Sequence, residues 1–191
     1  MNNFFLDTKK TSLFYKQEIS ILGSWTLVSY QNSIVGMNLP SMPFKPFKIR
    51  FEKKFNTKMI EDGNQPLLEE MAQQLNDYLN GTRKNFEISI NFENFGTKFQ
   101  QEVWNNILDI PYGKTASYSD IAKKIGKEKA TRAIGTALGR NPLPIVIPCH
   151  RVIGKRDLGG YAGGLSLKEY LLNLECGSKR KKRLSAFFDH Y

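Results

Sequence analysis

The segment Asn141-Pro142-Leu143-Pro144-Ile145-Val146-Ile147-Pro148-Cys149-His150-Arg151 is the most informative stretch of this 191-residue chain. Its three prolines in seven residues predict an extended, rigid segment and exclude a helix. A thiol is a nucleophile only as the thiolate, so Cys149 needs a base or a positive charge nearby. Neighbours in an extended segment point to opposite faces, so the residues leave open whether Cys149 and His150 are in direct contact or are bridged by a water molecule. Taken alone, such a pair is more often structural than catalytic.

The chain after Gly96 has a helical pattern. Thr97-Lys98-Phe99-Gln100 matches a capping box, which marks the start of a helix. The apolar stripe behind it has helical spacing and consists of Phe99, Val103, Trp104 and Ile107. Ile110-Pro111-Tyr112-Gly113 ends this helix. A last amphipathic helix is expected between Gly164 and Gly177, so the second half of the chain is predicted to be mainly α.

Between these elements the sequence predicts two short helices joined by a tight turn. One covers residues 119–125 and stops at Gly126, and the other runs from about 131 to 138 with Gly139 at its end. This pair favours a helix-turn-helix, although such pairs also occur in proteins that do not bind DNA. Arg132 is the only long polar side chain of the second helix. That composition fits a helix that grips the minor groove and inserts an arginine into the base stack, or equally a core helix with a solvated arginine.

The first half of the chain has an α+β pattern. The β-rich runs 25–30 and 33–37 flank Gln31-Asn32, which predicts a hairpin with a two-residue turn. Residues 47–51 and 86–90 are further strand candidates. A helix is framed by Pro66 and Gly81, and its apolar positions are Leu68, Met71, Leu75, Tyr78 and Leu79. We expect a small antiparallel sheet packed with one helix, and no catalytic constellation is visible in this half.

Charge indicates a polyanionic partner. Residues 1–96 carry 11 basic and 10 acidic side chains, whereas residues 97–191 carry 17 and 8. Positive charge confined to one half favours nucleic acid over a membrane surface. No run approaches the ~18 apolar residues of a membrane-spanning helix. We therefore expect an N-terminal α+β domain over residues 1–95 and a DNA-binding domain with a basic tail over residues 96–191.

Cysteine and histidine are too scarce for a disulfide framework or a structural metal site. Cys149 and Cys176 cannot staple a chain of this length. A four-ligand zinc site would need both cysteines together with His150 and His190, and their spacing fits no finger pattern. Residues 1–7 lack the basic start and long apolar stretch of a signal peptide, so a cytoplasmic protein is expected.

Pro148-Cys149-His150-Arg151-Val152 resembles the active-site motif of the O6-alkylguanine-DNA alkyltransferases, also called methylated-DNA–protein-cysteine methyltransferases. The resemblance covers residues 97–175 almost continuously, whereas the first half of the chain is similar only in layout. The other matching segments, in order, are Pro111-Tyr112-Gly113, Ser117-Tyr118, the Arg132 helix, Asn141-Pro142, Tyr161-Ala162-Gly163-Gly164-Leu165 and Lys168-Glu169.

The resemblance implies four catalytic roles. Cys149 would take the alkyl group from the guanine oxygen in a single displacement. His150 would act, through a water molecule, as the base that generates the thiolate. Glu175 would hold the imidazole and stabilise its charged form, and Asn141 would fix the turn that supports the cysteine segment.

The resemblance also implies contacts to a guanine that has left the duplex. Tyr118 would donate a hydrogen bond to its ring, and the backbone at Cys149 and Val152 would read its amino group. Tyr161 and Ala162 would complete the substrate site. Some family members have serine where Ala162 stands, so here only the backbone N–H could reach the guanine oxygen.

DNA contacts are expected from a further set of residues. Arg132 would fill the space left by the extruded base, and contacts to the DNA backbone would come from Ser119, Lys127 and Lys155. The run Lys179-Arg180-Lys181-Lys182-Arg183 lies outside the resemblance. A solvated chain end is favoured for it over added attraction to phosphate.

These observations predict a DNA-repair protein that moves an alkyl group from O6-alkylguanine in double-stranded DNA irreversibly to Cys149. O4-alkylthymine is a second candidate lesion. We expect a monomer with no cofactor, no metal and no membrane partner. The main alternative is a helix-turn-helix regulator with an inert cysteine. A lesion-binding relative without chemistry would lack the cysteine, and a cysteine hydrolase would need an oxyanion hole and would turn over.

Overall fold

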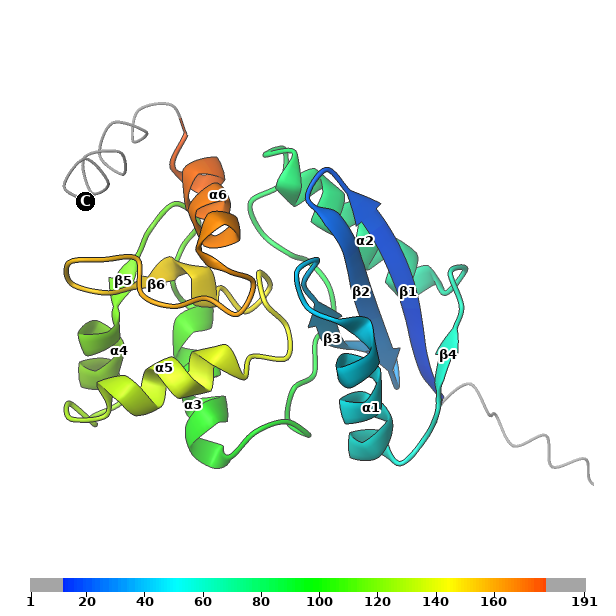
Figure 1. Cartoon of the computed structure of the whole chain (residues 1–191), viewed down its shortest axis with the longest axis horizontal. Coiled ribbons are helices and arrows are strands. Elements are labelled where there is room, and N and C mark those ends of the chain that lie inside the picture. The colour runs from blue at the N-terminus through cyan, green and yellow to red at the C-terminus, as the bar shows by residue number, and fades with distance from the viewer. Residues whose placement is uncertain (1–11, 178–191) are drawn as a thin grey trace, which may run out of the picture. The chain divides into compact units, whose positions relative to one another are not determined.

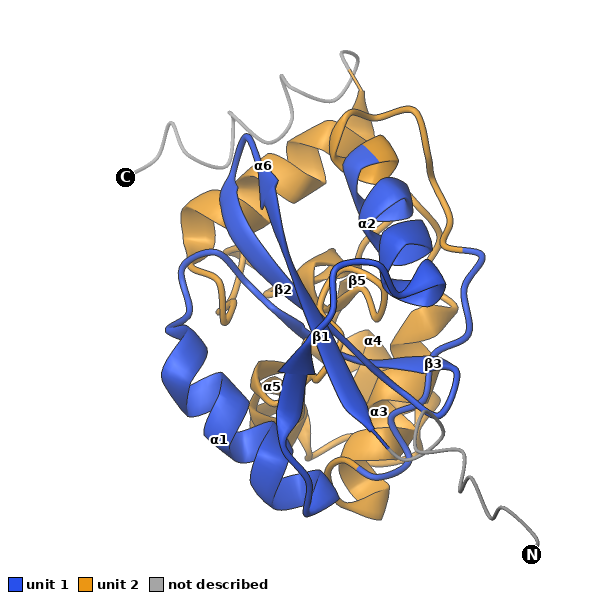
Figure 2. Cartoon of the chain, turned by 90° about the vertical axis from the view of Figure 1, so that its right-hand side faces the viewer, with its two compact units in different colours: residues 1–76, 87–94 blue, residues 77–86, 95–191 orange. Residues whose placement is uncertain are grey.

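The computed structural model describes residues 12–177, and Figure 1 shows the order of their helices and strands. The chain forms two compact units (Figure 2). Of the described residues, the N-terminal unit holds 12–76 and Glu87–Asn94, and the C-terminal unit holds Asp77–Phe86 and 95–177. Among residues 12–177, no helix combines the length and apolar character that a bilayer crossing requires. The division into domains at 1–95 and 96–191 stays a prediction, because the presence of two compact units does not test whether each one folds independently.

The N-terminal unit is built on a mixed sheet with the strand order β3-β2-β1-β4. Its strands are β1 (Leu13–Ser20), β2 (Gly23–Tyr30), β3 (Ser33–Asn38) and β4 (Met59–Glu61). The predicted hairpin is confirmed, because β2 pairs antiparallel with β3 and Gln31 and Asn32 have φ angles of 47° and 60°, as a type I′ turn requires. β4 pairs parallel with β1, which makes the expected antiparallel sheet a mixed one.

Two helices, α1 (Phe44–Phe55) and α2 (Pro66–Leu79), cover the sheet. Successive side chains of a strand point to opposite faces. In β1, the ring of Tyr15 lies 5.3 Å from that of Phe44 in α1, whereas the next residue, Lys16, pairs with Glu69 of α2 at 2.6 Å. The two helices therefore lie on opposite faces, which explains why the central strand β2 is buried on both of them.

Helix α1 corrects a prediction, because residues 47–51 are helical where a strand was expected. The five residues alternate apolar and polar, as in a strand. Over a wider window, however, Phe44, Phe47, Phe51 and Phe55 have the spacing of one helix face. Pro46 is tolerated because the first helical turn has no intrahelical partner for its missing N–H.

The strand expected over residues 86–90 is also wrong. Only an isolated bridge joins Ile90 to Ile34 of β3, with two backbone hydrogen bonds at Ile34. The Gln74 side chain accepts a hydrogen bond from the Glu87 N–H at 2.8 Å and donates one to its carbonyl at 3.1 Å. These contacts occupy backbone groups that a strand ladder would use.

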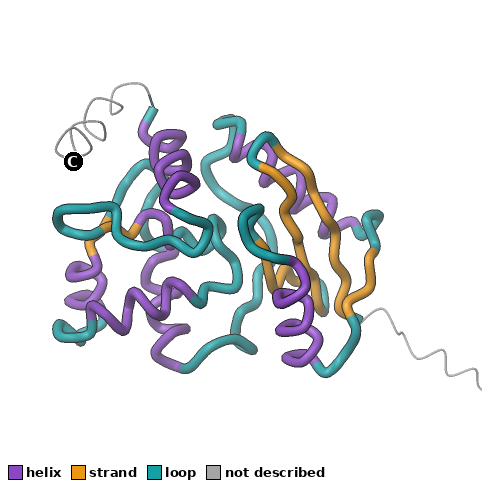
Figure 3. The backbone as a smooth tube through the Cα atoms, viewed as in Figure 1, coloured by secondary structure: helices purple, strands orange, loops and turns teal. Residues whose placement is uncertain are grey.

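The C-terminal unit is mainly helical, as predicted, and Figure 3 shows how helices and loops dominate it. Its elements are α3 (Lys98–Leu108), β5 (Ala116–Ser117), α4 (Tyr118–Lys124), α5 (Thr131–Gly139), the 3₁₀ helix η2 (Cys149–Arg151), β6 (Val152–Ile153) and α6 (Leu165–Cys176). The Thr97 capping box of α3 is confirmed by both of its reciprocal hydrogen bonds. The two short helices are present as α4 and α5, which pack against each other. A helix-turn-helix that binds DNA stays a prediction.

The segment before Cys149 is a compact turn, which corrects the expectation of an extended run. Ile147 N–H donates to the Leu143 carbonyl at 2.8 Å, and Ile145 between them has a φ of 75°. Prolines fix their own φ and favour extended neighbours, but both restraints are compatible with a turn between them. A β-branched residue at positive φ stores about 1–3 kcal/mol of strain, which surrounding contacts must hold in place.

Candidate active site

Asn141 holds the cysteine in place. Its side-chain N–H donates to the Ile147 carbonyl at 2.8 Å and lies 3.1 Å from the Cys149 Sγ, while its carbonyl accepts from Leu143 N–H at 3.0 Å. One amide side chain therefore fixes both the turn and the thiol. Cys149 follows at the first position of η2 and is 5% exposed. Asn141 therefore lies beside the thiol and the turn, and its supporting role in the reaction stays a prediction.

The surroundings of the thiol act on its charge in opposite directions. Burial raises the pKa of Cys149, whereas the hydrogen bond from Asn141 and the positive charge of Lys168 lower it. Lys168 is buried on α6, and its Nζ donates to the carbonyls of Val152 at 2.7 Å and Gly160 at 3.2 Å. Burial lowers the pKa of Lys168 to about 8, so near neutral pH it remains mostly a cation beside the sulfur.

His150 is fully buried and oriented by a carboxylate. Its Nε2 lies 2.8 Å from Oε1 of Glu175. The carboxylate is ionised and can only accept, so Nε2 carries the proton and Nδ1 has a free lone pair. Within residues 12–177, Nδ1 has no hydrogen-bond partner, and no hydrogen bond joins the His150 and Cys149 side chains. Burial lowers the pKa of His150 and outweighs the opposing effect of Glu175, so the imidazole is held in its neutral form, which can accept a proton at Nδ1.

The carboxylate of Glu175, in the last turn of α6, accepts hydrogen bonds from four residues, one of which is His150. Arg151 donates from Nε at 3.0 Å to each oxygen and from Nη2 at 2.9 Å to Oε1. Gly113 N–H donates to Oε2 at 2.9 Å. Burial raises the pKa of Glu175, but the bonds from His150 and Arg151 outweigh it and bring the pKa to about 2. Gly113 has a φ of 71°, and a Cβ there would lie 2.8 Å from the Glu175 carbonyl, so this position requires glycine.

The fourth donor is Tyr78, a residue that the sequence argument placed only in an apolar helix stripe. Its hydroxyl donates to Oε1 of Glu175 and lies 3.3 Å from Nε2 of His150. A buried tyrosine in such a stripe needs a hydrogen-bond partner, and this was the only local signal that it has one. No sequence pattern indicates that the partner lies 97 residues away.

A pocket of about 400 Å³ opens over the thiol. Its lining residues are Tyr118, Gly135, Leu138, Gly139, Cys149, Gly160, Tyr161 and Ala162. The structure therefore brings together three of the predicted substrate-binding residues with the predicted nucleophile. Gly159 has a φ of 64°, and a Cβ there would lie 2.5 Å from the Tyr118 hydroxyl, so glycine leaves space for that group.

Val152 is the predicted substrate-binding residue that does not line this pocket. It is buried in β6, its N–H donates to the Cys149 carbonyl, and its own carbonyl accepts from Lys168. Tyr161 lines the pocket with its hydroxyl buried and unpartnered within the described residues. Ala162 is exposed and lines the same pocket.

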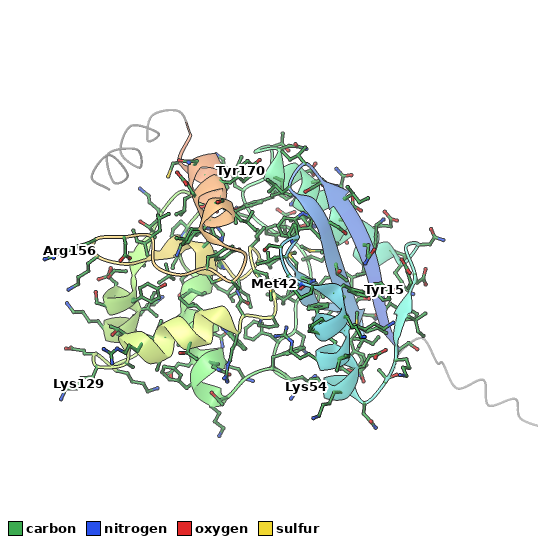
Figure 4. All side chains as sticks on the ribbon, viewed as in Figure 1. Tyr15, Met42, Lys54, Lys129, Arg156 and Tyr170 are labelled. Atoms are coloured by element: carbon green, nitrogen blue, oxygen red, sulfur yellow. The ribbon has the colours of Figure 1, made fainter. Side chains whose placement is uncertain are left out.

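The predicted DNA-binding residues do not line the pocket and lie on α4, on α5, in the loop between these helices and after β6. Arg132 is exposed on α5, and Lys155 is exposed after β6. Lys127 pairs with Glu102 and lies over the Phe99 ring, and Ser119 is half-buried with its hydroxyl 2.7 Å from that of Ser117. Figure 4 shows Lys129 and Arg156 also projecting outward from this unit. The lysine and arginine side chains among them are exposed and positively charged.

This arrangement can deliver a nucleophilic sulfur to a small ligand in the pocket. Cys149 lines the pocket, a neutral buried imidazole can take the proton of its thiol, and a carboxylate can stabilise the resulting imidazolium. Within the described part of the chain, no group of three or more histidine, cysteine or acidic residues is placed to hold a metal ion.

Comparisons with known proteins agree with this chemistry. The model of a family described as "6-O-methylguanine DNA methyltransferase, DNA binding domain" matches residues 98–177. The inducible methylated-DNA–protein-cysteine methyltransferase of Bacillus subtilis is 43% identical over 163 residues, which are 79% of this chain and 89% of that protein. That of Methanosarcina acetivorans is 50% identical over 113 residues, 59% of this chain and 71% of the relative.

Solved structures show the same likeness. The crystal structure of Mycobacterium tuberculosis OGT in complex with DNA matches with a TM-score of 0.73 and 36% identity. The match covers 85% of this chain and 92% of the mycobacterial one.

Proposed function

Because this chain belongs to the methylated-DNA–protein-cysteine methyltransferase family, we propose that it repairs O6-alkylguanine in double-stranded DNA by transferring the alkyl group to Cys149. The observation that carries the proposal is that Cys149 lines the pocket and is followed directly by the buried His150, which is paired with Glu175. O4-alkylthymine remains a proposed second substrate.

The first step of the proposed reaction makes the thiolate. The proton of Cys149 passes through a water molecule to Nδ1 of His150, whose lone pair is free. The imidazolium then donates from Nε2 to Glu175, and Arg151 and Gly113 hold that carboxylate still. Asn141 and Lys168 stabilise the negative sulfur. Because every group is already in place, little reorganisation accompanies the charge separation.

The second step is a displacement at the alkyl carbon. A C–S bond forms as the C–O6 bond breaks, and the guanine leaves with an electron pair that a proton must neutralise. Tyr118 lies in the pocket, where its hydroxyl can donate to the guanine ring. The backbone at Cys149, Val152 and Ala162 is proposed to hold the remaining edges of the base. The reaction needs no cofactor, because the sulfur supplies the electron pair.

The product explains why the reaction should stop after one turnover. A thioether has no carbonyl for water to attack and no oxyanion to stabilise, so the acceptor is not regenerated. We place the protein in the cytoplasm and treat it as a monomer as part of the same proposal.

Access to a base inside a duplex requires that the nucleotide leaves the stack. Arg132 on the exposed face of α5 is proposed to occupy the vacated space, and Ser119, Lys127 and Lys155 to contact the phosphates. Most side chains of α5 are small, which supports a close approach of this helix to the minor groove. The regulator alternative is not favoured, because an inert cysteine would not need a buried base and carboxylate beside it.

The experiment incubates the full chain with an excess of a duplex that contains one O6-methylguanine, followed by peptide mass spectrometry. We expect one methyl group per protein, on the Cys149 peptide, and repaired DNA equal to the amount of active protein. Methyl groups on Cys176, or repaired DNA in several-fold excess over protein, would contradict the proposal.

A further inference from the structure

A closed triangle of polar atoms lies behind the nucleophile. Oε1 of Glu175 is 2.8 Å from Nε2 of His150, the Tyr78 hydroxyl donates to the same oxygen, and that hydroxyl is 3.3 Å from Nε2. We propose that Tyr78 is a positioning residue for alkyl transfer, whose hydroxyl fixes the Glu175 carboxylate and limits how strongly it draws a proton onto His150. This inference rests on the proposed function.

The Tyr78 hydroxyl acts as a hydrogen-bond donor to Glu175 throughout. Burial and the neighbouring Glu175 charge raise the pKa of Tyr78 far above its ordinary value, so the hydroxyl keeps its proton and remains a donor. Oε1 then receives three donors, from Tyr78, His150 and Arg151. Each donor takes a share of the charge on that oxygen, so the loss of one leaves more charge facing His150.

By donating to Glu175, the Tyr78 hydroxyl disfavours a proton on His150. A weaker, opposite effect comes from its contact with His150 itself. The hydroxyl oxygen can accept from Nε2, which would stabilise the protonated imidazole. At 3.3 Å this contact is long for a hydrogen bond, and the hydroxyl proton is directed at Glu175. Removal of the hydroxyl should therefore make His150 easier to protonate.

Other charged and titratable groups near this triangle also affect the protonation of His150. Arg151 and Lys168 disfavour a proton on His150, and Glu175 favours one. The titratable and charged groups that face the triangle are Cys149, Arg151 and Lys168, Glu175, Tyr112 and Tyr161. None of these residues is replaced in Tyr78→Phe, so a shift in the titration of His150 reports the loss of the Tyr78 hydroxyl and its effect on Glu175.

The Tyr78 ring has its own structural role, which the test must separate from the role of the oxygen. The ring packs against Phe86 at a centroid distance of 5.4 Å and edge-on against Tyr112 at 5.9 Å. Tyr78→Phe keeps these contacts and removes only the oxygen. Tyr170→Phe is the matched control: its hydroxyl donates to the Leu79 carbonyl at 3.3 Å, next to Tyr78, and does not bond Glu175. Figure 4 labels Tyr170 on α6.

The first measurement is single-turnover methyl transfer from duplex O6-methylguanine as a function of pH. We expect Tyr78→Phe to slow transfer about threefold to tenfold at neutral pH, the range that one hydrogen bond supports. We also expect the acidic limb of the profile to move to higher pH, because more His150 is already protonated. Tyr170→Phe should change the rate less than about twofold and leave the limb in place.

The second measurement follows His150 itself by imidazole NMR. The chain has only two histidines, so a His190→Gln background leaves one signal set. In the folded protein, Tyr78→Phe should raise the titration midpoint of His150. Fluorotyrosine placed at position 78 keeps the ring and the hydroxyl but makes a stronger donor, so it should lower that midpoint. The opposite signs keep the test valid even if one variant is unstable.

The outcomes separate this inference from the proposed function. If the unsubstituted chain forms no thioether at Cys149, the proposed function is wrong. If it does form one while Tyr78→Phe matches Tyr170→Phe in rate, acidic limb and His150 titration, Tyr78 is only a packing residue and the inference is overturned.

Discussion

Within the C-terminal unit, the interior around Cys149 and the exposed surface around Arg132 differ in how their polar side chains are buried and bonded. Behind Cys149, the side chains of His150, Arg151 and Glu175 are buried and bonded to one another. Arg132 and Lys155 are exposed, and within the described residues neither side chain forms an ion pair. The buried groups are arranged for a reaction before substrate arrives, whereas the exposed cations gain their partners only when DNA binds. Changes inside should therefore act on chemistry, and changes outside on DNA.

The sharpest test of this comparison is Cys149→Ser. A serine hydroxyl is far less acidic than a thiol and a weaker nucleophile, so transfer should be abolished. The cysteine is 5% exposed, so affinity for DNA should stay within a few-fold of the unsubstituted chain. Single-turnover transfer and fluorescence anisotropy with a labelled duplex measure the two quantities. Residual transfer by this variant would remove Cys149 from its role.

Glu175→Gln should have the next largest effect. It removes the acceptor that stabilises imidazolium, so transfer should fall about 100-fold or more. It also leaves Arg151 buried without an opposite charge, which should lower the free energy of unfolding by about 3 kcal/mol. Urea denaturation at neutral pH gives the second value, and Glu169→Gln on the same helix is the control.

The same carboxylate makes stability depend on pH. Folding lowers the pKa of Glu175 from an ordinary 4.5 to about 2. The unfolded chain therefore binds this proton first, so the stabilisation is complete above about pH 4.5 and is lost as pH falls toward 2. The stability of Glu175→Gln should fall less steeply over that range. Equal acid profiles for the two proteins would show that Glu175 is not the group that titrates.

The structure as a whole shows which contacts can be predicted from the sequence. The Thr97 capping box and the 31–32 turn depend on residues next to one another, and both were predictable. The helix at 44–55 was missed because a five-residue alternation hid a longer period. Cys149 and His150 were found as adjacent residues, and Asn141 and Glu175 through the family resemblance. Tyr78 meets Glu175 only through the fold, and no local rule encodes that contact.

Arg132→Ala tests the exposed side of the comparison. If the arginine fills the space of an extruded base, its loss should slow repair of duplex DNA about 30-fold, since unstacking costs a few kcal/mol. Reaction with free O6-benzylguanine needs no extrusion and should change little. Rates for both substrates, measured with the same protein, separate the two steps. Equal losses on both would mean that the arginine supports the fold of α5.

The smallest expected effect belongs to single lysines at the surface. Lys155 is exposed and has no ion pair within residues 12–177, whereas Lys127 already pairs with Glu102. A cation that is free before binding releases a counterion from DNA for each phosphate it meets, and a paired one must first give up its partner. Lys155→Ala should therefore weaken binding a few-fold and reduce the salt slope of the binding constant by about one.

Lys127→Ala should reduce the slope less, and Lys54→Ala, on α1 of the nearly neutral half, should leave it unchanged. Binding of an undamaged duplex at several salt concentrations measures all three variants. An equal loss for Lys54 and Lys155 would mean that attraction to DNA is spread over both halves of the chain. Loss at Lys155 alone would place the phosphate contacts on the surface that carries Arg132, where repair of a duplex needs them.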